Sequence, residues 1–77
     1  MMGQALYYIV SDDGRWKVRH SGADYPYLTR PTALSAAIDA AHTSGSRGHE
    51  AEVLSQDDGG AWRSEWAYGR DPYPPSG

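Results

Sequence analysis

Three histidines, His20, His42 and His49, are the residues best suited to bind a metal ion. Their spacings of 22 and seven residues match no standard metal-binding pattern, and the chain has no cysteine to supply a thiolate. A histidine near the end of a helix is also stabilised by the helix dipole, which accounts for His42 without a ligand. We therefore expect no metal site and no cofactor.

Two pairs of neighbouring carboxylates, Asp12-Asp13 and Asp57-Asp58, each precede a glycine. Paired carboxylates suit acid–base chemistry or calcium binding. Aspartate before glycine is, however, favoured in tight turns, where its side chain bonds the local backbone. The loop Gly45-Ser-Arg-Gly48 resembles a phosphate-binding loop, but it follows a predicted helix, whose negative end faces it. No serine lies in a nucleophile-elbow pattern, so we predict no catalytic residues and no enzyme.

A helix is predicted between Thr29 and Gly45, the segment with the clearest helical period. Its apolar residues recur with spacings of three and four, while polar residues occupy the positions between them. Thr29 is expected to cap the first turn, and Gly45 to end the helix in the left-handed conformation. The buried stripe comprises Leu34, Ala37, Ile38 and Ala41. Because half of this stripe is alanine, the facing layer must supply the bulk.

Tyr-, Trp- and Val-rich segments flank the helix and are predicted to form hairpins. In the first, Leu6–Ser11 and Trp16–His20 are joined by a type I′ turn at Asp13-Gly14, which pairs Ile9 with Val18. In the second, Glu50–Ser55 and Ala61–Trp66 flank the turn Asp57–Gly60. A loop centred on Asp58-Gly59 places Glu52 opposite Glu65, an unfavourable pair, so this register stays open. Tyr25–Leu28 either adds a short edge strand or remains unpaired, since Pro26 removes one ladder donor.

Together these elements predict a two-layer α+β domain. One α-helix packs on an antiparallel sheet of four to five strands in the order β-β-(β)-α-β-β. The helix stripe is expected to meet a set of core residues from both hairpins, namely Ile9, Trp16, Val18, Val53 and Trp62. Residues 1–69 form this domain, and 70–77 form a proline-rich tail. Tyr68, just before the tail, and Tyr73 within it can cover one end of the core.

Three stretches together resemble a known family. They are the Tyr7-Tyr-Ile-Val-Ser-Asp-Asp-Gly-Arg-Trp-Lys-Val-Arg19 hairpin, the Thr29-led alanine-rich helix and the closing Tyr68-Gly-Arg-Asp-Pro-Tyr-Pro-Pro75 motif. The chain resembles the small bacterial domain-of-unknown-function family 2188. It departs from the family pattern by extra length around Gly59-Gly-Ala61 and by Trp66. The resemblance implies a compact αβ unit and carries over no catalytic residue.

The remaining candidate for function is a surface rather than a cavity. On the predicted register, Tyr8, Lys17 and Arg19 stand on the sheet face turned away from the helix, where Arg63 can join them. This face suits a protein partner or a second copy of the chain, paired through the face or an edge strand. Nucleic-acid binding through the same residues is the alternative, although the net charge of −3 disfavours it. No stretch is apolar enough to span a membrane, and the absence of cysteine fits a cytoplasmic, non-catalytic interaction module.

Overall fold

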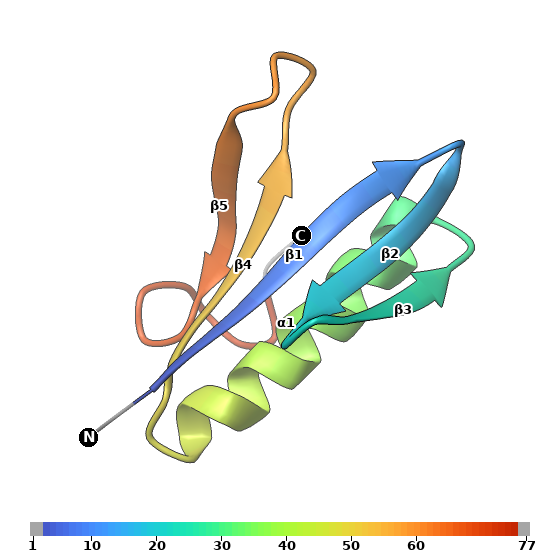
Figure 1. Ribbon diagram of the computed structural model, residues 1–77. Helices are drawn as coiled ribbons and strands as arrows, with labels where there is room; N and C mark the ends of the chain where they lie inside the picture. Colours follow the sequence, from blue (N-terminus) through green and yellow to red (C-terminus); the bar gives the residue numbers. More distant parts are fainter. Residues whose placement is uncertain (1–2, 76–77) are drawn as a thin grey trace.

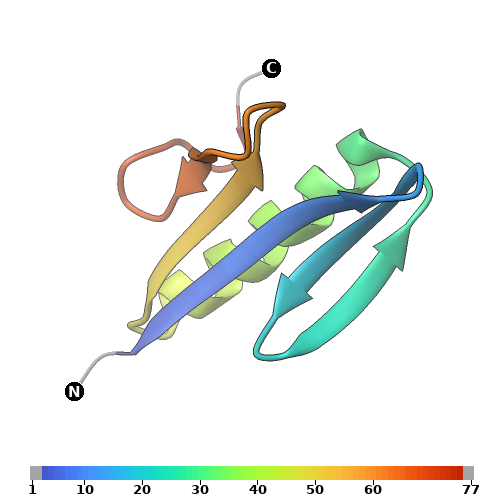
Figure 2. The same ribbon diagram turned by 45° about the horizontal axis from the view of Figure 1, so that its top comes forward.

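A computed structural model describes residues 3–75 and contains one helix and five strands (Figure 1). The elements follow the chain as β1 (Gln4–Asp12), β2 (Arg15–His20), β3 (Ala23–Tyr27), α1 (Arg30–Ser46), β4 (Glu50–Gln56) and β5 (Trp62–Ala67). The strands form a single sheet in the order β3-β2-β1-β4-β5. The helix lies across one face of this sheet, as the turned view in Figure 2 shows, so the two-layer α+β fold is confirmed.

The sheet is mixed rather than purely antiparallel, because β1 and β4 run parallel. The third strand causes this difference. With β3 present, three antiparallel strands precede the helix, and the returning helix delivers β4 in the same direction as β1. Without β3 the chain would enter β4 in the opposite direction. The sequence left this strand open, and the structure includes it, with Pro26 on the edge strand opposite Lys17.

The helix begins as predicted but ends later. Thr29 is the N-cap, and its side chain accepts a hydrogen bond from the backbone N–H of Thr32. Gly45, expected to stop the helix in the left-handed conformation, instead lies buried inside it. A Cβ at this position would lie 2.1 Å from the ring of Tyr68. Gly45 is therefore required for close approach to Tyr68, and the left-handed glycine that follows the helix is Gly48, with φ of 97°.

The core consists of the alanine stripe and the sheet residues beneath it. Ala33, Ala37, Ile38 and Ala41 are buried on α1, while Leu34 is only half-buried. The predicted sheet partners Ile9, Val18 and Val53 are buried, and Trp16 packs against them. Trp62 was wrongly predicted as a core residue, since 46% of it is exposed. Trp66, with 2% exposed, fills the core instead.

The first hairpin has the predicted register, with Ile9 opposite Val18 and Ser11 opposite Trp16. Its turn places Asp13 at φ 54° and Gly14 at φ 74°, both positive as a type I′ turn requires. Positive φ at Gly14 costs little because glycine lacks a Cβ.

The second hairpin avoids the unfavourable pair by using a longer loop and a bulge. Asp57 N–H donates to the carbonyl of Ala61, which leaves a three-residue loop that ends at Gly60 with φ of 87°. A β-bulge then places Glu65 between two paired positions, since Leu54 faces Ser64 while Val53 faces Trp66. Glu52 consequently lies opposite Ala67 rather than Glu65.

The segment after β5 folds back onto the helix. Tyr73 stacks on the ring of His42 with centroids 3.7 Å apart, and its hydroxyl donates to Asp39 Oδ1 at 2.8 Å. The indole N–H of Trp66 donates to the Pro72 carbonyl at 2.8 Å. Residues 70–73 of the predicted tail therefore pack on the domain, and His42 serves as their platform. Residues 76–77 lie outside the described part of the chain.

Candidate functional site: the open face of the sheet

The sheet face opposite the helix carries no covering layer within residues 3–75 (Figures 1 and 2). The pleat sends alternate residues of β1 to this face, and their neighbours Ala5, Tyr7 and Ile9 into the core. An apolar stripe crosses the middle of the open face and consists of Leu6, Tyr8, Val10, Leu54 and Trp62. The first four are half-buried by their neighbours, and Trp62 is largely exposed.

Trp62 is the residue that extends the stripe onto the outer strand β5. Its ring meets the ring of Tyr8 edge-on, with centroids 5.1 Å apart and planes at 69°. Because Tyr8 is on β1 and Trp62 on β5, this contact spans the intervening strand β4. Two amphipathic rings are thereby held together at the centre of the open face, an arrangement common in protein-contact surfaces.

Both predicted cations of β2 lie on the open face, but each already has a carboxylate partner. Arg19 Nε lies 2.8 Å from Asp24 Oδ1, and Lys17 Nζ lies 3.4 Å from Asp12 Oδ2. The hydrogen bond to Asp24 raises the pKa of Arg19, and the same bond holds the pKa of Asp24 below its usual range. The positive charge that the sequence assigned to this face is therefore largely neutralised locally.

Arg63 does not join the candidate residues, contrary to the prediction. It pairs with Ser55, which is buried on the helix side, so the pleat turns Arg63 toward that side as well. The three-residue loop causes the difference, because one extra loop residue exchanges the faces of the following strand. Trp62 takes the place expected for Arg63. The adjacent glycines Gly59-Gly60 were the only sequence signal for this longer loop.

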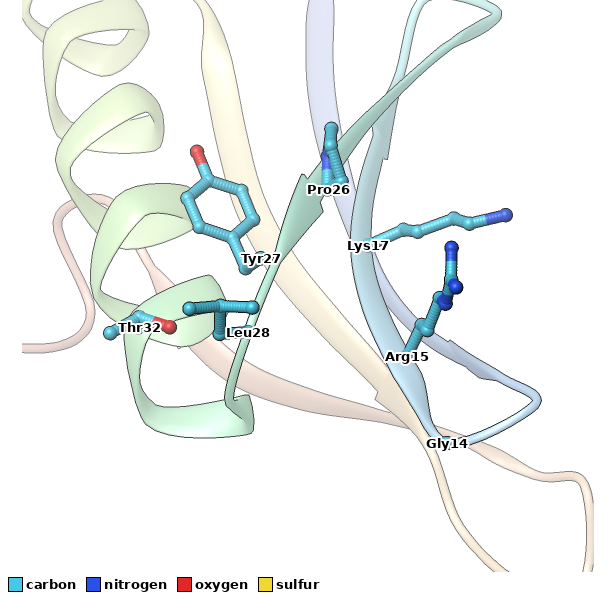
Figure 3. A pocket seen from close by; sticks show the side chains of 7 residues that line it. All are labelled: Gly14, Arg15, Lys17, Pro26, Tyr27, Leu28 and Thr32. Atoms are coloured by element: carbon cyan, nitrogen blue, oxygen red, sulfur yellow. The ribbon is translucent and has the colours of Figure 1, made fainter.

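A groove of about 770 Å³ wraps around the β3 edge beside the open face. Figure 3 shows Lys17 and Arg15 projecting from one side of β2, while Tyr27 points toward the helix. Leu28, which links β3 to the helix, also lines the groove and is 95% exposed. The lining side chains thus project to opposite sides of a sheet edge, which makes this groove a rim of the open face and not an enclosed site.

The histidines and carboxylates that could bind a metal ion do not gather into one site within the described residues. Among residues 3–75 there is no cluster of three His, Asp or Glu side chains able to hold a metal ion. His20 Nδ1 bonds the Leu6 carbonyl, and His42 stacks on Tyr73. Asp57 Oδ1 accepts hydrogen bonds from the N–H groups of Gly59 and Ala61, both at 2.9 Å. The predicted turn role of Asp57 is confirmed.

A buried polar cluster on the helix side has a structural explanation. Ser55, the one buried polar residue in the described core, donates to Glu65 Oε2 and lies within reach of Arg30. Arg30 also pairs with Glu65 at 3.2 Å. The bulge directs Glu65 toward this pair, so each polar group beneath the start of α1 has a partner. This cluster could not be predicted from the sequence, because it depends on the bulge.

Comparison with protein families identifies the fold unit. The model of domain-of-unknown-function family 2188, described as an uncharacterised protein conserved in bacteria, matches residues 7–68. The chain belongs to this family. No curated protein and no solved structure matches the chain. The family match therefore identifies the domain formed by the two hairpins and the helix. The open face of its sheet is interpreted from its geometry. In residues 3–75, α1 is neither long nor apolar enough to cross a bilayer.

Proposed function

We propose that this member of family 2188 is a non-catalytic protein-contact module that pairs through the open face of its sheet. A second copy of the chain is the simplest partner. The observation that carries the proposal is the stripe Leu6–Tyr8–Val10–Leu54–Trp62, which is apolar and has no second layer over it within the described chain. A chain without cysteine is compatible with such a module working in the reducing cytoplasm.

The area that a protein interface needs is a small share of the surface of this protein. A standard interface removes roughly 800 Å² from each partner. That is about 15% of the 5201 Å² surface of the described protein. Packing two such faces against each other gives an aligned β-sandwich, which is a common way to bury sheet faces of this kind. Association would also compensate for a core that contains mostly alanine on its helix side.

The pairing of charges favours a protein partner over nucleic acid. A nucleic-acid surface needs cations that are free to replace counterions on phosphates. Here Arg19 and Lys17 are paired with Asp24 and Asp12, and Arg63 is on the other face, so that Arg15 is the one cation of β2 on the open face for which the described chain shows no ion pair. Nucleic-acid binding therefore becomes the alternative outcome of the test.

Sedimentation velocity over a wide range of concentrations tests self-association. We expect the sedimentation coefficient of the 8.4 kDa chain to rise with concentration toward that of a dimer. Trp62→Glu should abolish this rise, because it introduces a charge into the apolar stripe. Leu28→Glu is the matched control, since Leu28 is more exposed but lies in the link between β3 and α1, outside the apolar stripe. A rise that survives Trp62→Glu, or that Leu28→Glu removes equally, would contradict the proposal.

If the wild-type chain stays monomeric, the self-association version is wrong. Affinity capture from the native cell extract then tests a different protein partner, using wild-type and Trp62→Glu baits with and without nuclease. A protein retained by the wild-type bait alone, and unaffected by nuclease, supports the contact module. Retention that disappears with nuclease, together with salt-sensitive binding of an oligonucleotide that requires Lys17 and Arg19, would establish the nucleic-acid alternative.

A further inference from the structure

A second surface lies on the helix side of the sheet, where α1 leaves β2 and β3 partly uncovered. The stripe Ala33–Ala37–Ala41 is buried, and α1 packs mainly on β1 and β4. The side of α1 facing β3 offers only the small side chains of Ala36 and Ala40. A cleft of about 310 Å³ results between α1 and the outer strands. Its aromatic walls are Tyr7, His20, Tyr25 and Tyr27.

The inner wall of this cleft is held in place. Tyr7 and His20 stack with centroids 4.0 Å apart and planes at 13°. The Tyr7 hydroxyl is hydrogen-bonded to Ser44 Oγ on α1 at 2.6 Å, and His20 Nδ1 to the Leu6 carbonyl at 2.9 Å. Because a carbonyl oxygen only accepts, this hydrogen bond places a proton on Nδ1. The wall therefore holds two stacked π-systems in fixed positions.

The outer wall consists of two tyrosines whose rings have no aromatic partner among residues 3–75. Tyr25 and Tyr27 point to the helix side, since they pair with Val18 and Trp16. Tyr25 nevertheless remains 50% exposed, because only alanines face it from the helix. No hydrogen bond within the described chain involves either hydroxyl. Exposed ring faces and free phenol oxygens thus line a cleft large enough for a small ligand or a side chain.

The chemistry of the lining selects a flat cation. Tyrosine rings attract cations over their faces, and no Lys or Arg lines the cleft to repel one. A guanidinium group is planar, stacks on aromatic rings and donates N–H bonds in its own plane, where the phenol oxygens of Tyr25 and Tyr27 can accept them. The net charge of −3 further favours a cationic guest. An anion would find only hydroxyl donors here.

We propose that this cleft binds the guanidinium group of an arginine side chain on a partner polypeptide. The cleft lies on the opposite side of the sheet from the open face. The proposal is therefore independent of the contact module, and one can fail without the other.

The test is an NMR titration that follows the methyl signals of Ala36 and Ala40. N-acetyl-arginine-N-methylamide is the probe, and the equivalent citrulline compound is the control, because citrulline has the same shape without the charge. We expect a saturable shift with arginine and binding about two- to fivefold weaker with citrulline, which is the effect of losing one exposed cation–π contact. Equal binding of the two compounds, or shifts that never saturate, would overturn the proposal. Lysine binding as tight as arginine would overturn the guanidinium assignment.

Variants at Tyr25 separate the ring from its hydroxyl. Tyr25→Phe keeps the π-system, whereas Tyr25→Leu keeps only apolar area, so we expect arginine to bind Tyr25→Phe better by the same two- to fivefold. Amide spectra confirm that each variant stays folded, and Tyr27→Leu replaces Tyr25→Leu if that variant does not. Equal affinity of the Phe and Leu variants would show that the rings do not contact the cation.

Discussion

The two hairpins of this protein start from nearly the same turn sequence and place their tryptophans on opposite faces. Both turns contain Asp-Asp-Gly. In the first, a two-residue loop puts Trp16 on the helix side, paired with Ser11. In the second, a three-residue loop pairs Trp62 with Gln56 and turns it to the open face. In both hairpins the Trp pairs with the residue before Asp-Asp-Gly, so the faces differ because Ser11 lies on the helix side of β1 and Gln56 on the open face of β4.

The alternation of faces also changes within β5. The bulge at Glu65 inserts one extra residue between Trp62 and Trp66, so that Trp66 points to the helix side opposite Val53. One short strand thus supplies an aromatic ring to each face. The first hairpin contains no bulge, and its residues alternate between the two faces of the sheet without interruption. The comparison shows how loop length and a bulge together decide which aromatic residue becomes core and which becomes surface.

The largest expected difference is between the two tryptophans of β5. Trp66→Ala removes a ring that is 2% exposed and its hydrogen bond to Pro72, and should lower the free energy of unfolding by about 3–5 kcal/mol. Trp62→Ala removes a ring that is 46% exposed and should cost less than about 1.5 kcal/mol. Urea unfolding measures both, and Trp66→Phe gives a milder value if Trp66→Ala does not fold. The reverse order would mean that Trp62 is the core residue.

A smaller effect distinguishes the loop types through the glycines of the second turn. Gly60 has φ of 87°, so Gly60→Ala should cost about 1–2 kcal/mol of stability. Gly59→Ala should be nearly neutral, because its Cβ meets only Asp57 Oδ1, at 3.4 Å. If the loop were instead a two-residue turn at Asp58-Gly59, Gly59 would require positive φ, and Gly59→Ala would be the more destabilising variant. Thermal unfolding of the two variants therefore decides between the two loops.

The smallest effect concerns two Arg–Asp pairs, Arg19–Asp24 between β2 and β3 and Arg70–Asp71 after β5. Hydrogen bonds from Arg70 and from the Ala67 N–H lower the pKa of Asp71. A carboxyl group with a lowered pKa in the folded state adds stability above its unfolded pKa of about 3.9, and this stability is lost as pH falls through the folded pKa. Asp71→Asn should therefore be less stable than wild type at neutral pH, and the gap should narrow below about pH 4.

Asp24, on β3, is the carboxyl group with which the pH effect of Asp71 can be compared. Its pKa is lowered by Arg19, without a backbone N–H donor. Asp24→Asn should consequently change the acid limb of the stability curve less than Asp71→Asn. Urea unfolding at pH 7 and pH 3 gives both differences. Stability curves of Asp71→Asn and wild type that run parallel across this range would show that the ionised Asp71 does not stabilise the fold.

Local patterns predicted the first half of the molecule well. The Thr29 cap, the Asp13-Gly14 turn and the pairing of Ile9 with Val18 each depend on residues close in sequence. The faces of Tyr8, Lys17 and Arg19 followed from that register and are confirmed. The ion pair of Arg19 with Asp24 was missed, because it requires β3, and the sequence left the pairing of this strand open.

The errors arose where a distant contact decides between local alternatives. Gly45 is the residue type expected where a helix ends. In the structure Tyr68, 23 positions later, packs against it, and the helix continues past it. Asp58-Gly59 and Gly59-Gly60 each suit a tight turn, and the structure uses a three-residue loop together with the bulge at Glu65. Arg63 and Trp62 were assigned to the wrong faces for this reason. A parallel β1–β4 pair likewise depends on how many strands precede the helix.

The central position of β1 has a consequence for synthesis of the chain. Its partner β4 ends at Gln56, 44 positions after the end of β1 at Asp12. At bacterial elongation rates of about 5–20 residues per second, one side of β1 waits roughly 2–9 s for its neighbour. During that interval β1, β2 and β3 can pair, while the backbone groups along the free side of β1 remain open to other chains. Once β4 has been made, the helix that precedes it brings it beside β1, and the pairing closes this open side.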